Sequence, residues 1–210
     1  MHNIPVAYED QWFLIADKPA GLLTIPAPKK ESRTLTGILN DELKKGNAAY
    51  RLHPCHRLDK ETSGLIIYAK GKSIQKKMMD EFKERKVKKV YLGFVQGSIK
   101  DDAGEIKKPL EGRYALTRFQ ILKRMPGFSV LEIMPLTGRK NQVRIHFKGI
   151  GHPLVGESKF AYRKDYPLKA KRALLHAGFI EFTHPVTGKK VRVFSAMPED
   201  MQDFLNKHNH

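Results

Sequence analysis

Short apolar runs alternate along the chain with segments whose apolar residues recur at helical spacing. Apolar, often β-branched runs bounded by turn residues predict strands, at 12–16, 64–69, 90–97, 116–123, 129–136 and 174–182. Apolar residues that recur every three or four positions predict amphipathic helices, at 34–45, 72–86, 141–151 and 198–208. Gly46 and Gly151 are expected to end two of these helices.

The order of these elements indicates a fold class. Strands and helices do not follow the regular alternation of a doubly wound sheet, so we predict an α+β fold with a long, mixed and mostly antiparallel sheet and flanking helices. The 210 residues suffice for one domain with a substantial core. Because neither a repeat nor a low-complexity linker interrupts the pattern, we expect a single domain over residues 1–210.

Charge then suggests a partner. Lys and Arg number 39 against 22 Asp and Glu, which gives a formal net charge of +17. Basic residues spread through a foldable chain usually create one face or groove of positive potential, and we expect a central basic cleft that suits a polyanion such as a phosphate backbone. The alternative is a solvated, lysine-rich surface without a partner.

Several protein classes are excluded by composition. Cys55 is the single cysteine, so a scaffold held by intrachain disulfides is excluded. No apolar run approaches the roughly 20 residues that span a bilayer, and we expect no membrane partner. Acidic residues stand within the first twenty positions, where a secretory signal would be basic and then apolar. We therefore expect a soluble, cytoplasmic protein.

The densest polar cluster is HPCHRLDKETSG at 53–64, directly before the predicted strand at 64–69. Asp59, with Arg57 before it and Thr62 and Ser63 after it, fits a functional loop, because loops held by a strand often present reactive groups. The alternative is a capped or salt-bridged turn.

Other chemistries find less support. His53, Cys55 and His56 lie close together, but one cysteine and no second ligand pair do not make a zinc site, so we expect no metal. The sequence contains neither GxxxxGK[ST] nor GxGxxG, so we expect no nucleotide cofactor and no other cofactor. Ser63 lacks the GxSxG context of a serine nucleophile.

The segment HRLDKETSGLIIYAK at 56–70 resembles the signature loop of the RluA-type pseudouridine synthases, in which HRLDxxTSG presents an essential aspartate. Further segments resemble that family's motifs in the family's order: DKPAGLLTIP (17–26), KKVYLGFVQG (88–97), PLTGRKNQVRIHF (135–147), GHPLVGESKF (151–160) and LLHAGFIEFTHPVTG (174–188). The likeness covers roughly 12–198. Asn141 stands where the family usually has histidine, which we expect to alter local hydrogen bonding only. We also expect the chain to lack the family's frequent N-terminal S4-like domain.

The resemblance implies the pseudouridine synthase catalytic fold and an isomerase that converts uridine in RNA to pseudouridine. It implies that Asp59 is the catalytic carboxylate and that Arg144 is its ion-pair partner. Tyr91 matches the family's tyrosine, whose ring stacks on uracil and whose hydroxyl suits proton transfer from C5. The reaction adds and removes no atom, which agrees with the missing cofactor motifs.

The same resemblance assigns further positions. Arg57 would fill the space of the flipped nucleotide or hold its phosphate, and Thr62, Ser63 and Gly64 would shape the loop. The remaining RNA-binding set, in which a role in loop positioning is equally open, is His56, Lys18, Lys89, Arg139 and Gln142. The basic helix at 72–86 would follow phosphates without reading sequence.

The implied partner is a stem-loop of ribosomal or transfer RNA, and the implied state is a monomer. A rival interpretation is a non-catalytic RNA-binding assembly factor on the same fold, which explains the charge equally well. Binding alone, however, needs none of Asp59, Tyr91 and Arg144. A metal-dependent nuclease is a more distant alternative.

Overall fold

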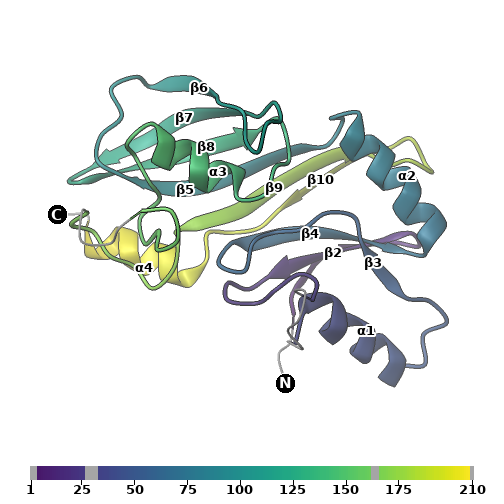
Figure 1. Cartoon of the computed structure of the whole chain (residues 1–210). Coiled ribbons are helices and arrows are strands. Elements are labelled where there is room, and N and C mark those ends of the chain that lie inside the picture. The colour runs from purple at the N-terminus through teal and green to yellow at the C-terminus, as the bar shows by residue number, and fades with distance from the viewer. Residues whose placement is uncertain (1–3, 27–32, 162–165, 209–210) are drawn as a thin grey trace. The chain divides into compact units, whose positions relative to one another are not determined.

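The computed structural model describes residues 4–26, 33–161 and 166–208. Within them, ten strands and four helices form an α+β fold around a mixed sheet, shown in Figure 1. This confirms the predicted fold class. The predicted central basic cleft stays a prediction. No helix among the described residues is long and apolar enough to cross a membrane.

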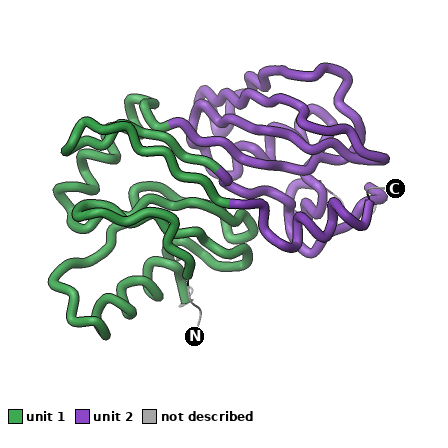
Figure 2. Tube along the Cα trace, turned by 180° about the vertical axis from the view of Figure 1, so that it is seen from behind, with its two compact units in different colours: residues 1–87, 179–195 green, residues 88–178, 196–210 purple. Residues whose placement is uncertain are grey.

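The chain divides into two compact units, coloured separately in Figure 2. Unit 1 comprises residues 1–87 and 179–195, and unit 2 comprises residues 88–178 and 196–210. Strand β9 (Leu175–Thr183) runs from unit 2 into unit 1. The single domain expected over 1–210 stays a prediction.

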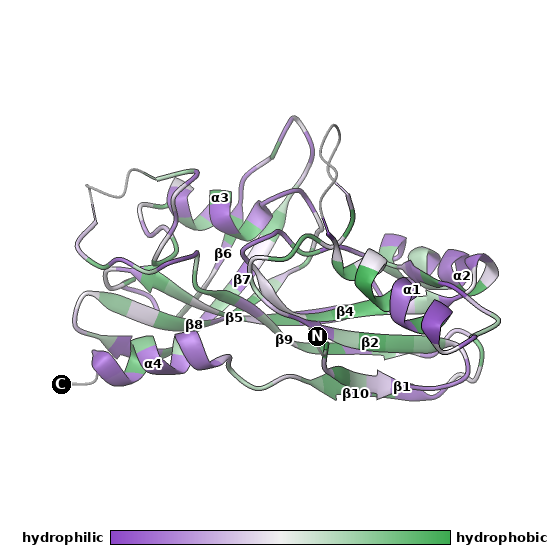
Figure 3. Cartoon of the chain, turned by 90° about the horizontal axis from the view of Figure 1, so that it is seen from below, coloured by the Kyte–Doolittle hydropathy of each residue, from purple (hydrophilic) through white to green (hydrophobic). Residues whose placement is uncertain are grey.

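Unit 1 is built on antiparallel strands. Its strands besides the second part of β9 are β1 (Val6–Glu9), β2 (Phe13–Lys18), β3 (Leu52–Pro54), β4 (Ser63–Lys70) and β10 (Lys190–Phe194). Strand β2 pairs with β1 and β4, β3 extends along β4, and β10 pairs with β9. In Figure 3, β2 and β4 are mostly green, that is hydrophobic, as expected for strands that are buried on both faces.

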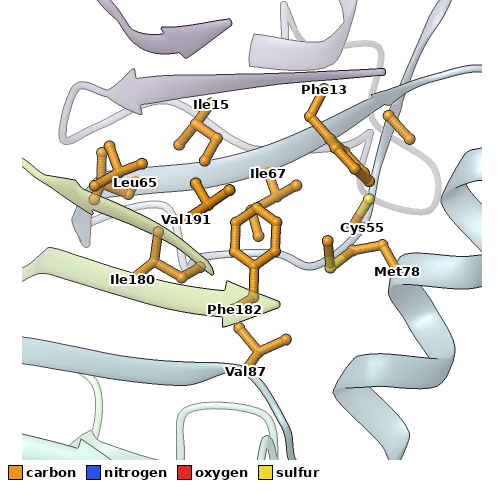
Figure 4. Close-up of a cluster of buried hydrophobic side chains, with 12 residues drawn as sticks. Phe13, Ile15, Cys55, Leu65, Ile67, Met78, Val87, Ile180, Phe182 and Val191 are labelled. Carbon is orange, nitrogen blue, oxygen red and sulfur yellow. The ribbon is translucent and has the colours of Figure 1, made fainter. Parts of the chain in front are cut away.

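Alternate residues of these strands make the core of unit 1. Figure 4 shows Phe13, Ile67 and Phe182 pointing toward one another. This follows from the two-residue repeat of a strand, which places every second side chain on one face. Met78 of α2 (Lys72–Lys83) completes the cluster, as the predicted apolar stripe of that helix requires.

Local backbone signals set the start of α1 and the end of α2. Helix α1 (Leu35–Lys45) begins with Thr34 accepting from the amide of Gly37. Helix α2 was expected to reach residue 86, but it ends at Lys83 because Arg85 adopts φ 59°. The Lys86 amide then donates to the Glu81 carbonyl, the bond that closes a Schellman motif and satisfies a terminal carbonyl.

Unit 2 holds an antiparallel sheet in the order β5-β8-β7-β6. The strands are β5 (Lys88–Gln96), β6 (Ala103–Lys107), β7 (Leu116–Met125) and β8 (Phe128–Pro135). Helices α3 (Gln142–Gly149) and α4 (Glu199–Lys207) belong to the same unit. Met201 and Phe204 of α4 pack on Phe94 and Phe128, and Figure 3 shows both green and purple along that helix.

Candidate active site

Asp59 lies on a tight turn of unit 1, between β3 and β4. Its carbonyl accepts a hydrogen bond from the Thr62 amide at 3.1 Å, and Asp59 itself is half-buried. Leu58 is buried and Arg57 is exposed, so the Leu58 side chain anchors this segment in the protein interior while Arg57 faces solvent.

Thr24 holds one side of this turn. Its hydroxyl donates to the Leu58 carbonyl at 3.0 Å and lies 3.2 Å from the Leu58 amide, which donates to it. Both polar backbone groups of a buried residue are thus satisfied by one side chain. The turn therefore cannot shift without breaking buried hydrogen bonds.

Lys18 holds the other side of the turn. The side chain is fully buried, and its ammonium donates to the carbonyls of Pro19, Leu22 and Lys60 at 2.9, 2.8 and 3.2 Å. A buried charge needs such compensation, and three carbonyl dipoles supply it. Because Lys60 follows Asp59, these hydrogen bonds fit a role of Lys18 in positioning the turn, one of the two roles that the sequence left open. Contact between Lys18 and RNA stays a prediction.

The remaining residues of the cluster tie the turn to β4. The His56 ring accepts the Ile67 amide through Nε2 at 3.0 Å and lies 4.9 Å, between ring centroids, from Phe82. Thr62 and Ser63 are buried, and Gly64 has φ 114°, a conformation that residues with a side chain rarely adopt. These contacts fit the loop-shaping role that the sequence assigned to 62–64.

In unit 2, Gln142 organises the start of α3. Its side-chain oxygen accepts from Thr137 Oγ1 at 2.7 Å and from the Arg139 amide at 3.0 Å. Its Nε2 donates to the Leu116 carbonyl and to Thr117 Oγ1. Gln142 is buried, so this geometry is that of loop positioning, while its contact with RNA stays a prediction.

Asn141 precedes the helix with φ 53° and ψ 23°, and its side chain does not cap the helix. Asparagine tolerates this left-handed conformation better than most residues. Its carbonyl accepts from the Ile145 amide at 3.0 Å. Asn141, which replaces the family's usual histidine, therefore stands at a position where the structure shows a left-handed backbone and a main-chain hydrogen bond.

His146 continues the buried network of α3. Its Nε2 faces the Lys108 carbonyl at 3.0 Å, which can only accept, so Nε2 carries the proton and Nδ1 accepts from Thr117. Burial lowers the pKa of the imidazole and outweighs the hydrogen bond to the Lys108 carbonyl, which raises it, while the Lys108 charge lowers it slightly further. His146 is therefore a neutral structural residue.

Arg144 is held by a partner that the sequence interpretation missed. Its Nε and Nη2 each donate to one oxygen of Glu157 at 2.7 Å, and the two side chains are only 6% and 1% exposed. Glu157 also accepts the backbone amides of Lys159 and Phe160. The Arg144 guanidinium lies 5.3 Å from the centre of the Phe160 ring. The predicted pairing of Arg144 with Asp59 stays a prediction.

The charge state of Glu157 follows from these contacts. Burial alone would raise its pKa, but the Arg144 hydrogen bonds and charge and the two backbone amides outweigh burial and lower the pKa. The carboxylate is therefore ionised and fixes the plane of the guanidinium. Glu157 lies within the segment at 151–160 that resembles a family motif, and this position was the only signal that could have identified it.

Strand β5 carries two further predicted site residues. Tyr91 is 8% exposed and stands opposite Ile133 of β8 in the antiparallel register. Lys89, two residues earlier, is half-buried, and burial lowers the pKa of its ammonium. Arg139 is half-buried as well, and its Nε donates to the Tyr114 carbonyl at 3.1 Å.

The predicted site residues are thus divided between the two units. Unit 1 holds Lys18, His56, Arg57, Asp59 and 62–64 around one turn. Unit 2 holds Arg139, Gln142 and Arg144 at or just before α3, and Lys89 and Tyr91 on β5. In the described parts of the chain, no three His, Cys, Asp or Glu side chains gather as metal ligands would.

Known proteins match this chain along most of its length. Residues 12–148 match the family model for RNA pseudouridylate synthase. The chain is 35% identical over 198 residues to the dual-specificity RNA pseudouridine synthase RluA of Vibrio cholerae, covering 87% of this chain and 78% of the relative. It is 33% identical over 220 residues to the uncharacterized RNA pseudouridine synthase YlyB of Bacillus subtilis, covering 97% and 72%.

Solved structures share the fold. Human RNA Pseudouridylate Synthase Domain Containing 4 superposes with a TM-score of 0.82 at 22% identity, covering 97% of this chain and 92% of that one. Human RNA Pseudouridylate Synthase Domain Containing 1 gives a TM-score of 0.74 at 25% identity, covering 92% and 83%.

Fold, family model and relatives define one class of protein, the isomerases that act on RNA to form pseudouridine. The chain belongs to the RNA pseudouridine synthase family, and its relatives include members of the RluA type.

Proposed function

We propose that this chain, acting over residues 1–210 as one catalytic domain, isomerises specific uridines in structured ribosomal or transfer RNA. The bond from C1′ to N1 breaks, the detached uracil turns, and a bond from C1′ to C5 forms. The proton lost from C5 is matched by one gained at N1, so the step balances without a cofactor. The target must leave the helical stack to enter the site.

Asp59 is the catalytic carboxylate of this proposal, attacking C1′ or assisting a glycal-like intermediate. The observation that carries the assignment is the turn itself, in which Thr24 and Lys18 fix the backbone on both sides of Asp59. Such preorganisation is what a reacting group needs, because misplacement by about 1 Å costs about 100-fold in rate.

Arg144 is the proposed partner that keeps Asp59 ionised. The contacts with Glu157 fix its guanidinium, whose fork can serve more than one acceptor. Tyr91 would stack on the uracil and move the C5 proton. Its small exposed fraction suits a ring that forms the wall of a pocket.

Substrate RNA would be held by the basic residues. Arg57, which is exposed on the Asp59 turn, is proposed to fill the space that the flipped nucleotide leaves or to hold its phosphate. His56, Lys89 and Arg139 are further proposed RNA-binding residues. Exposed lysines of α2 would bind phosphates, which sets affinity and salt sensitivity without reading sequence. We further propose that the protein works as a cytoplasmic monomer.

Pseudouridine mapping tests this proposal. RNA from cells with and without the gene is treated with an adduct-forming reagent and mapped by primer extension. We expect one or a few sites to disappear in the deletion and to return with the wild type or with Asp41→Asn, an exposed acid on α1. Asp59→Asn should bind RNA and restore no site.

Two outcomes would count against the proposal. Restoration of sites by Asp59→Asn would remove Asp59 from its role. Tight RNA binding by the wild type with no lost site in the deletion strain would favour the non-catalytic assembly factor.

A further inference from the structure

Tyr114 and Phe194 are the exposed aromatic side chains among the described residues, at 50% and 72% exposure. Phe194 packs on Phe179, with ring centroids 4.6 Å apart, and the charge of Arg192, two residues before Phe194, is paired with Glu181. Tyr114 lies instead on the loop that joins β6 to β7. A single exposed aromatic ring needs no explanation by itself, so its surroundings decide.

The loop that carries Tyr114 is rigidly built. The amides and carbonyls of Leu110 and Arg113 exchange two hydrogen bonds of 2.9 and 3.0 Å, with positive φ at both Glu111 and Gly112. Two such residues make the tight turn that a two-residue hairpin favours. Leu110 and Ala115 are buried on either side, so Arg113 and Tyr114 are held out to solvent.

Hydrogen bonds fasten this loop to α3. Arg139 Nε donates to the Tyr114 carbonyl at 3.1 Å, and Gln142 Nε2 donates to the Leu116 carbonyl at 2.9 Å. His146 Nε2 meets the Lys108 carbonyl at 3.0 Å. The backbone that carries the exposed ring is therefore fastened to the helix that carries Arg144.

The anchored segments are strongly basic. Lys107, Lys108, Arg113 and Lys140 are all exposed, against the exposed acids Glu111 and Glu105, and Glu105 pairs with Lys107 and Arg118. The Glu105 hydrogen bond and charge raise the pKa of Lys107, so that ammonium stays protonated. An aromatic face beside several cations suits a chain of bases and phosphates.

We propose that Tyr114 stacks on an unpaired base of the RNA substrate while Arg113 contacts a neighbouring phosphate. This proposal rests on the proposed function, and it names a contact outside the predicted catalytic residues. Single-stranded bases are recognised by stacking on aromatic rings, and arginine binds the phosphate between them. The rigid anchoring lowers the entropy lost when the contact forms.

Fluorescence anisotropy with two probes tests the proposal, using a short labelled strand of uridines and an abasic strand of the same length. Tyr114→Ala should weaken binding of the uridine strand about tenfold and leave the abasic strand unchanged. Tyr114→Phe should bind both as the wild type does. Arg113→Gln should weaken both and lower the salt slope by about one. Phe194→Ala is the matched control and should change neither.

Equal loss on both strands for Tyr114→Ala, or no loss on either, would overturn the stacking contact. So would a wild type that does not distinguish the two strands. Turnover separates this result from failure of the proposed function. With substrate RNA, Tyr114→Ala should raise KM and keep kcat, whereas a wild type that forms no pseudouridine contradicts the proposed function and leaves the strand comparison to decide about Tyr114.

Discussion

Removal of the Glu157 carboxylate should destabilise unit 2 strongly. The pair with Arg144 is buried and joined by two hydrogen bonds of 2.7 Å. Loss of one partner of such a pair leaves an uncompensated charge and costs about 3–5 kcal/mol. Glu157→Ala should reach the upper part of that range, because the amides of Lys159 and Phe160 lose their acceptor as well.

Thermal unfolding followed by far-ultraviolet circular dichroism measures this loss. In a chain of this size about 1 kcal/mol shifts Tm by about 2–4 °C, so a loss of about 4–5 kcal/mol in Glu157→Ala should lower Tm by about 8–20 °C. Trp12, the single tryptophan, lies in unit 1 and reports on that unit separately. Because the substitution destabilises unit 2, we expect it to lower the transition temperature measured by Trp12 fluorescence less than the one measured by circular dichroism.

Acid should reduce the effect of this substitution. The pKa of Glu157 is lowered in the folded chain, so the unfolded chain binds its proton first as the pH falls. The contribution of the carboxylate is therefore complete above its ordinary value of 4.5 and disappears as the pH drops through the folded pKa. The gap in stability between wild type and Glu157→Gln should narrow over that window.

Glu105→Ala is the matched control in the same unit. Glu105 pairs with Lys107 and Arg118 at the surface, where water and salt screen the charges. It should melt close to the wild type. A Glu157→Ala protein that melts no lower than this control, or a Glu157→Gln gap that persists undiminished in acid, would refute the reasoning.

Two further predictions follow from buried groups. Lys18→Met should lower the free energy of unfolding, measured in urea, by about 1–3 kcal/mol, because three carbonyls lose their donor. It should also lower kcat, because the Asp59 turn is no longer held in place. An unchanged kcat in the folded variant would contradict the positioning role. His146, whose pKa is lowered by burial, stays neutral when folded and protonates on unfolding below pH 6.5, so wild-type stability should fall with acid below that value by up to about 1.4 kcal/mol per pH unit. The same pH series on His146→Gln should show a shallower slope, and equal slopes would exclude His146 as the cause.

Much of the fold could be predicted because its central elements repeat regularly. Strand β4 contains the continuous apolar run at 64–69, and β8 is apolar at most of its positions. Helix α3 ends at Gly149, two residues before Gly151, the glycine expected to end it, which has φ 83°. Strands β1, β3, β6 and β10 were not predicted. Strands β1 and β6 are short and mostly exposed, so pairing with neighbouring strands rather than an apolar pattern defines them. In β10 the buried Val191 and Val193 alternate with exposed residues, a pattern that does indicate a strand.

The candidate site was predictable only as far as local motifs carry it. Asp59 and Arg144 were predicted as site residues from short contiguous patterns. Glu157 was missed because its partner stands thirteen positions away and no spacing rule links them. Lys18 was open between two roles, since only the folded chain shows that its ammonium is enclosed by carbonyls.

The Asp59 turn is held through backbone atoms, and this opens a route to spectroscopy. Thr24, Lys18 and the Gly21 amide contact main-chain groups of Leu58 and Lys60, so the exposed Lys60 side chain can be exchanged without disturbing these bonds. Burial raises the pKa of the Cys55 thiol to about 12, which leaves the only native thiol unreactive. A fluorophore attached through Lys60→Cys would therefore label one position, next to Asp59, and report the arrival of RNA in real time.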